Sequence, residues 1–169
     1  MKKIPLSRGR FALVDDEDYD WLMSWKWHLV VDRNNCAYAI RHTGTVNGER
    51  GIIRMHRLLM NTPSGMEVDH ADGDGLNNQR NNLRNCSKAE NQRNKKRQAN
   101  NTSGFKGVVI DYENRLKRRK RIRAKIGYNG KVILLGRFST VVDAAKAYDA
   151  KAKELFGSFA RLNFPEVAR

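Results

Sequence analysis

The spacing of apolar residues is clearest in the last third of the chain. Between positions 141 and 156 they recur at i, i+3, i+4 and i+7, at Val141, Ala144, Ala145, Tyr148, Ala152, Leu155 and Phe156. This spacing is typical of an amphipathic helix with one buried face. Thr140 followed by Asp143 fits an N-terminal capping box, and Gly157 suits the position after the last turn. The pattern predicts a helix over residues 141–156.

Three short segments before this helix have the pattern of strands, over residues 105–111, 122–128 and 132–138. From Ile122 to Ile126, apolar and basic residues alternate, as in a half-buried strand with a basic outer face. Asn129 and Gly130 between the last two segments are a strong signal for a two-residue hairpin turn. We therefore expect residues 104–169 to form a three-stranded antiparallel sheet packed on one helix.

The first half of the chain has a less regular pattern. It predicts strands over 11–15, 38–42 and 52–55, a short helix over 18–27 that carries three tryptophans, and a helical turn over 56–60. Ser87 with Glu90 three residues later forms a second capping box and predicts a helix over 87–94. Strands and helices in both halves assign the chain to the α+β class.

Charge changes this picture, because 33 Lys and Arg against 18 Asp and Glu give a net charge of +15. An excess of this size indicates a polyanionic partner. Residues 95–131 hold 13 Lys or Arg and only two acids, Asp111 and Glu113, a net of +11. The polar segment 95–103 fits a linker, so we predict domains over 1–94 and 104–169.

Membrane and secreted classes are not favoured by the sequence. No apolar run approaches the roughly 20 residues that cross a bilayer. The segment after Met1 is interrupted by charges, which argues against a signal peptide. Cys36 and Cys86 have no metal-binding spacing and are expected to be reduced thiols. We therefore expect a cytoplasmic protein, in a bacterium or a phage-infected host cell, with no membrane partner.

Residues 67–94 carry the candidate chemistry, and three interpretations compete. A calcium loop would use the Asp72-Gly-Asp74-Gly segment, but Leu76 and Leu83 would occupy its ligand positions 5 and 12. A second interpretation is a stretch rich in Asn, Asp and Gly that only forms turns. The third is a nuclease site, in which Asp69 and His70 close a short strand and Asn82 and Asn91 follow 12 and 21 positions after the histidine.

This arrangement resembles the HNH nucleases, in the His-Asn-Asn form of phage-type homing endonucleases. The resemblance is carried by Asp69-His70, the Asp72-Gly73 turn, Asn77-Asn78, Asn81-Asn82-Leu83, Glu90-Asn91 and the upstream His56-Arg57-Leu58. It implies a ββα-metal motif over about residues 66–94 and hydrolysis of phosphodiester bonds.

The resemblance also implies a role for each of four residues. His70 is the general base, because a neutral imidazole can take a proton from water near pH 7. Asn82 orients His70 or holds the loop. Asp69 and Asn91 are oxygen ligands for one Mg²⁺ or Mn²⁺ ion per site, with Asn94 as the alternative to Asn91.

Residues 105–165 resemble the apetala-two, or ethylene-response-factor, DNA-binding family. The resemblance is carried by Phe105-Lys106-Gly107-Val108, Arg123-Ala124-Lys125-Ile126, Leu135-Gly136-Arg137-Phe138, Thr140, Ala144-Ala145, Ala147-Tyr148-Asp149 and Leu162-Asn163-Phe164-Pro165. It implies a sheet in the major groove of double-stranded DNA. Two family tryptophans are replaced, by Ile122 and Leu134. The expected DNA-binding residues are Lys106, Arg115, Arg118, Arg119, Lys120, Arg121, Arg123, Lys125 and Arg137.

Together the two resemblances predict a metal-dependent DNA endonuclease with a C-terminal targeting domain. One active site per chain favours nicking by a monomer, while a dimer could cut both strands. A DNA-binding transcriptional regulator with an inactive nuclease fold is the alternative. An RNA-binding protein is less favoured, since the sequence lacks an aromatic ribonucleoprotein motif.

Overall fold

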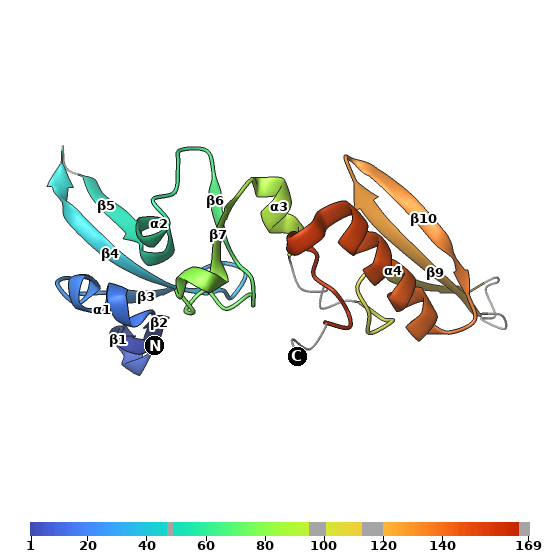
Figure 1. The fold of residues 1–169 in the computed structure, drawn as a ribbon, viewed down its shortest axis with the longest axis horizontal. Coiled ribbons are helices and arrows are strands. Elements are labelled where there is room, and N and C mark those ends of the chain that lie inside the picture. Colours follow the sequence, from blue (N-terminus) through green and yellow to red (C-terminus); the bar gives the residue numbers. More distant parts are fainter. Residues whose placement is uncertain (47–48, 95–100, 113–119, 166–169) are drawn as a thin grey trace. The chain divides into compact units, whose positions relative to one another are not determined.

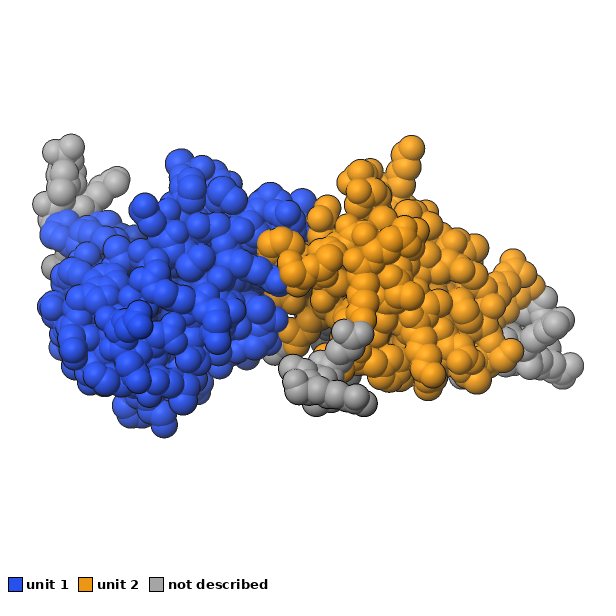
Figure 2. Space-filling model, viewed as in Figure 1, with its two compact units in different colours: residues 1–91 blue, residues 92–169 orange. Residues whose placement is uncertain are grey.

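The computed structural model describes residues 1–46, 49–94, 101–112 and 120–165. The chain forms two compact units, unit 1 over residues 1–91 and unit 2 over residues 92–169 (Figure 2). Each unit contains short antiparallel strands and helices (Figure 1). This confirms the predicted mixture of helices with small antiparallel sheets. The predicted linker lies partly outside the described residues, at 95–100.

The described residues of unit 1 form three small sheets. The first pairs β1 (Lys2–Pro5) with β2 (Phe11–Val14), and the second has the order β3 (His28–Val31), β4 (Ala37–Val46), β5 (Glu49–Arg54). The third is the hairpin of β6 (Glu67–His70) and β7 (Leu83–Cys86). The helices are α1 (Asp16–Leu22), α2 (Met55–Leu59) and α3 (Lys88–Arg93), and the boundary between the units falls within α3.

The predicted helix over 18–27 is shifted in the structure. Helix α1 begins earlier, at Asp16, because three acidic residues in its first turn complement the positive end of the helix dipole. It ends at Leu22, whose carbonyl accepts a hydrogen bond of 2.8 Å from the Trp27 indole. Trp25 and Trp27 therefore lie after the helix, and the chain continues directly into β3, which the sequence pattern did not indicate.

The N-terminal residues complete the core of unit 1. Buried side chains of β1, β2 and α1 cluster with Met55, Leu59, Val68, Leu76 and Leu83. The Leu13 N–H donates to the Leu76 carbonyl, and the Asn78 N–H donates to the Leu13 carbonyl, both at 2.8 Å. Strand β2 is thereby paired in parallel with the segment that follows His70.

The part of unit 2 that the structure describes has one sheet and one long helix. Strands β8 (Val108–Tyr112), β9 (Lys120–Tyr128) and β10 (Lys131–Phe138) are antiparallel with β9 in the centre, and α4 (Val141–Phe156) packs against them. Asn129 and Gly130 both have positive φ, as the predicted hairpin turn requires. The Thr140 hydroxyl accepts from the Asp143 N–H, which is the predicted cap of α4.

Two further observations concern membranes and thiols. Among the residues that the structure describes, no helix has the length and apolar character needed to cross a membrane. Cys36 is exposed, Cys86 is buried, and both are free thiols.

Candidate active site

The β6–β7 hairpin places the predicted base and the predicted metal ligand next to each other. Asp69 pairs with Arg84 and His70 with Leu83 in the register of the two strands. Because side chains alternate along a strand, Glu67 and Asp69 share one face while His70 points to the other. Asp69 and His70 are both almost fully buried, at 3% and 6% exposure.

On the Asp69 face, each acidic or amide side chain has a specific partner. The Asp69 carboxylate accepts hydrogen bonds from Arg84, from Nε at 2.8 Å and from Nη2 at 2.5 Å. Asn91 on α3 donates from Nδ2 to Glu67 Oε2 at 2.6 Å. The structure thus joins Glu67 to Asn91 and Asp69 to Arg84. Glu67 could have been found from sequence, since it lies two positions before Asp69.

Helix α3 is oriented by the predicted capping box. Glu90 accepts from the Ser87 N–H at 2.8 Å and from the Ser87 hydroxyl at 2.7 Å, while the Glu90 N–H donates back to that hydroxyl at 3.3 Å. This box fixes the start of α3 one turn before Asn91. Asn94, the alternative ligand, is buried and belongs to unit 2.

Asn82 holds the loop between the two strands. Its Oδ1 accepts from the Asp72 N–H at 3.0 Å, and its Nδ2 donates to Asp72 Oδ1 at 3.1 Å and to the Asn77 carbonyl at 2.8 Å. The Asn82 carbonyl also accepts from the Ala71 N–H. These bonds concern the loop, and the two roles expected for Asn82 stay predictions.

A second set of polar contacts attaches this loop to the beginning of unit 1. Asp18 accepts from Arg80, from Nε at 2.8 Å and Nη2 at 2.7 Å, and the Arg80 guanidinium keeps the pKa of Asp18 below its ordinary value. Asp15 accepts from the Arg80 N–H at 2.8 Å and from the Gln79 side chain at 3.1 Å. No local pattern in the sequence indicates these contacts, because they join residues more than 60 positions apart.

The surroundings of His70 favour its neutral form. Burial is the largest influence and lowers the pKa of His70, while Asp72, Asp69 and the Asn78 side chain oppose the shift. The rings of His56 and Tyr38 lie beside the His70 ring, with centroids 5.1 Å and 6.1 Å away. A neutral imidazole is the form that can accept a proton from water.

The oxygen donors of the hairpin fit a small divalent cation. Asp69, Glu67 and Asn91 offer carboxylate and amide oxygens, the ligand type that Mg²⁺ and Mn²⁺ prefer. The Arg84 guanidinium on Asp69 shows that this carboxylate binds a positive group in its buried position. Within the described ranges, no three His, Cys, Asp or Glu side chains gather as a cation site.

The predicted DNA-binding residues lie in three different settings. Arg121, Lys125 and Arg137 are exposed on strands β9 and β10, and Arg123 pairs with Asp111 across the sheet. Lys106 is partly buried, donates to the Arg93 carbonyl at 2.6 Å, and has its pKa lowered to about 8 by burial and Arg161. Arg115, Arg118 and Arg119 lie outside the described residues, as does the side chain of Lys120.

Ile122 and Leu134, which the sequence resemblance singled out, face different sides of this sheet. Ile122 is buried, at 7% exposure, in the cluster under α4. Leu134 is exposed at 56% and lies opposite Lys125 in the strand register. Leu134 can therefore make contacts from the outer face of the sheet, and Ile122 cannot.

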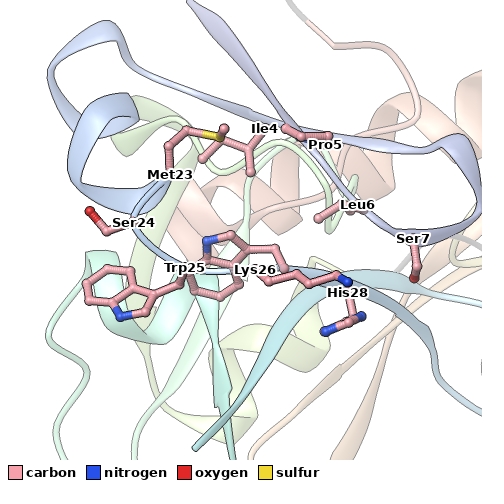
Figure 3. A pocket seen from close by; sticks show the side chains of 10 residues that line it. Ile4, Pro5, Leu6, Ser7, Met23, Ser24, Trp25, Lys26 and His28 are labelled. Carbon is pink, nitrogen blue, oxygen red and sulfur yellow. The ribbon is translucent and has the colours of Figure 1, made fainter.

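An open cavity of about 450 Å³ lies elsewhere in unit 1, between β1 and the turn after α1. Its lining includes three buried side chains, Ile4, Leu6 and Trp27. Figure 3 shows the Lys26 side chain extending toward His28. Its lining contains neither Asp69 nor His70. This cavity and the candidate chemistry are thus separate features of this unit.

Comparison with known proteins agrees with this geometry. The family model described as HNH endonuclease matches residues 61–93, which span β6, β7 and α3. An uncharacterized HNH endonuclease of Acanthamoeba polyphaga mimivirus is 30% identical over 162 residues, covering 92% of this chain and 76% of that protein. No solved structure matches the chain. HNH nucleases generally use a divalent metal ion, in agreement with the oxygen donors of the hairpin. The buried Asp69-His70 pair on its hairpin lies within the matched segment, and this chain belongs to the HNH endonuclease family, a family of phosphodiester hydrolases.

Proposed function

We propose that the chain is a homing-type endonuclease that hydrolyses one specific site in double-stranded DNA. The nuclease domain spans residues 1–94, and residues 104–169 are a targeting domain of the apetala-two type. The observation that carries this proposal is the placement of Asp69 and His70, side by side and buried, at the end of β6 in the segment matched by the HNH family.

His70 is the general base in this proposal. Its burial favours the neutral imidazole, which removes a proton from the attacking water. Asn82 holds the loop that follows His70 through its bonds to Asp72 and Asn77, and so fixes where the strand ends. The role of Asn82 is therefore positioning, since its bonds go to the loop.

Asp69 and Asn91 hold one Mg²⁺ or Mn²⁺ ion in this proposal, with Glu67 orienting Asn91 through their hydrogen bond. The bound ion would polarise the scissile phosphate and stabilise the leaving oxygen. Arg84 balances the buried charge of Asp69 through its two hydrogen bonds. A buried carboxylate without such a partner would be costly, and the two hydrogen bonds from Arg84 offset that cost.

The outer face of the unit 2 sheet binds DNA in this proposal. Along β9, Arg121, Arg123 and Lys125 alternate with the buried Ile122, Ala124 and Ile126, so the basic side chains share one face. Arg137 on β10 lies opposite Arg123 in the register. A row of basic residues on one face is suited to phosphate contacts, which supply affinity and register on the duplex. A monomer with one such site nicks one strand.

The test is site mapping followed by base removal. A randomised plasmid library is incubated with the full chain and Mg²⁺, and the cleavage ends are mapped strand by strand to obtain a preferred site. His70→Ala should then lower the single-turnover rate on that site by roughly 10²–10⁴-fold, the usual worth of a general base. Its DNA affinity should stay within twofold of wild type, because the basic residues of unit 2 are unchanged.

Two controls accompany this test. His42→Ala removes an exposed histidine of the same unit and should cleave like wild type. Excess chelator should stop cleavage by the wild-type chain completely. Wild-type rates in His70→Ala would reject His70 as the base, and cleavage in excess chelator would reject the metal mechanism.

A further inference from the structure

Three rings from three separate elements meet at the candidate base. Tyr38 comes from β4, His56 from α2 and His70 from β6. The centroids of the His56 and His70 rings are 5.1 Å apart with an interplanar angle of 87°, and Tyr38 lies 5.4 Å from His56. These are edge-to-face contacts, the geometry that aromatic pairs prefer and that restrains ring rotation.

The burial of His56 is difficult to explain by packing alone. The residue is 6% exposed, and its Nδ1 has no hydrogen-bond partner among the described residues. A buried polar atom without a partner destabilises the fold, and an apolar side chain would fill the same space without that cost. Burial is the largest of the influences that lower the pKa of His56 to about 3, so its ring adds no positive charge beside His70.

The loop after His70 also packs against this ring cluster. Gly75 approaches Tyr38 so closely that a Cβ there would lie 2.7 Å from Cδ1 and Cε1 of the ring, and 2.4 Å from the Ala37 carbonyl oxygen. The loop is itself fixed by the bonds of Asn82. Tyr38 is therefore packed closely against both Gly75 and His56.

We propose that His56, supported by Tyr38, is a positioning residue that holds the His70 imidazole in the orientation needed to take a proton from water. The inference rests on the proposed role of His70 as general base. A strand-end histidine has two rotatable side-chain bonds, and a buried ring packed edge-to-face against it removes most of that freedom. Catalysis depends on such placement, because a displacement of about 1 Å can lower a rate by on the order of 100-fold.

The experiment compares His56→Ala, His56→Phe and the control His42→Ala in the full chain. We expect His56→Ala to lower the single-turnover rate on the preferred site by about 10- to 100-fold with DNA affinity unchanged. His56→Phe keeps an aromatic ring against His70 and should recover most of that rate. His42→Ala should match wild type, because His42 is exposed and lies beside His28 instead.

A double variant tests whether His56 acts through His70. His56→Ala combined with His70→Ala should be no slower than His70→Ala alone. Once the His70 imidazole has been removed, the loss of the residue that positions it can have no further effect. A merely structural role would instead add its own loss. If His70→Ala cuts at the wild-type rate, the proposed function fails. If His70→Ala is inactive and a folded His56→Ala is fully active, only the present inference fails.

A variant away from both histidines covers the case in which His56→Ala does not fold. Gly75→Ala keeps both histidines but pushes on Tyr38, and it should slow the chemical step by about tenfold or more without changing DNA affinity. Thermal unfolding and circular dichroism confirm that each variant is folded. A folded Gly75→Ala with the wild-type rate, or a folded His56→Phe as slow as His56→Ala, would overturn the proposal.

Discussion

The two units differ in what they bury. Unit 1 buries several polar or ionisable side chains, at Asp18, His56, Asp69, His70, Asn78 and Asn82, whereas the described part of unit 2 buries Asn94 and Asp149. Unit 2 instead places basic side chains on an exposed sheet face and apolar ones beneath α4. A reaction site needs polar groups held away from water, and a surface for a polyanion needs charges in water.

Asp149 shows that polar burial serves a different purpose in unit 2. Its carboxylate accepts from the backbone N–H groups of Asn163 and Phe164 and from the Asn163 side chain, at 2.8–3.0 Å. The Asn163 side chain in turn bonds both backbone groups of Lys106. This network fastens the segment after α4 to the segment before β8. In unit 2, the polar contacts of Asp149 join two segments of the chain that are distant in sequence. In unit 1, buried polar groups lie around His70.

Disrupting the apolar packing of unit 2 should destabilise that unit strongly. Gly107 has φ +76°, and a Cβ there would lie 1.9 Å from Cδ2 of Tyr148. Gly107→Ala should cost unit 2 roughly 3 kcal/mol or more, from the left-handed backbone and the overlap together. Thermal unfolding monitored in unit 2 measures the loss. Gly127→Ala on β9 has open space around it and should change stability far less; equal losses would show that Tyr148 packing is not the cause.

A polar deletion in unit 1 should affect the reaction more than the fold. Asn82→Ala removes three hydrogen bonds of the loop and leaves buried groups unpaired, at a cost of about 1–3 kcal/mol. We expect cleavage to fall by about tenfold or more, because the end of β6 is no longer fixed. Single-turnover rates and unfolding by urea measure both effects. The exposed neighbour Asn81→Ala is the control, and equal rates for the two variants would contradict the loop-holding role.

Charge removal on unit 2 should affect binding and leave the chemistry intact. Replacing Arg121, Lys125 and Arg137 by Gln should reduce the slope of log affinity against log salt by about 2.7, if each contacts one phosphate. The rate at saturating protein should stay near wild type. Replacing the three lysines of α4, Lys146, Lys151 and Lys153, is the matched control. An unchanged slope in the first variant would locate the DNA-binding surface elsewhere.

The smallest expected effect is a pH-dependent one in unit 1. The hydrogen bond from Arg80 lowers the pKa of Asp18, so the charged form stabilises the folded state above the ordinary pKa of 3.8. This contribution is lost as the pH falls through the lowered pKa. Asp18→Asn should cost about 1 kcal/mol at neutral pH, discounted because Arg80 is half exposed, and should approach wild type in acid. Chemical denaturation across pH measures it, with the exposed Asp20→Asn as control.

Local signals in the sequence were sufficient for many elements. The capping boxes at Ser87 and Thr140 and the turn at Asn129 are confirmed, because each depends on residues within three positions of one another. Strands β1 and β3 were missed, since each is only four residues long and depends on partners for its stability. The roles expected for His70, Asp69 and Asn91 remain predictions.

The sequence could indicate candidate residues that are neighbours in the chain, but not the contacts between segments far apart in sequence. Asp69 and His70 are adjacent in sequence, so a motif could place them. Tyr38, His56 and Asp15 reach the same region through contacts that span 14 to 65 positions, and no spacing rule encodes these. The ionic contact of Asp18 with Arg80 is likewise set only when the core of unit 1 assembles.

The pairing of Leu13 with the segment around Asn77 has a consequence for how the nuclease is made. During synthesis, β2 leaves the ribosome more than 60 residues before the partner that it needs, so it must wait until that segment has been translated. Closing so long a loop costs chain entropy and is typical of slow folding steps. The β6–β7 hairpin can form locally, but its loop is secured only after this late pairing. A nascent chain is therefore expected to gain its candidate site as one of the last features of unit 1 to become ordered.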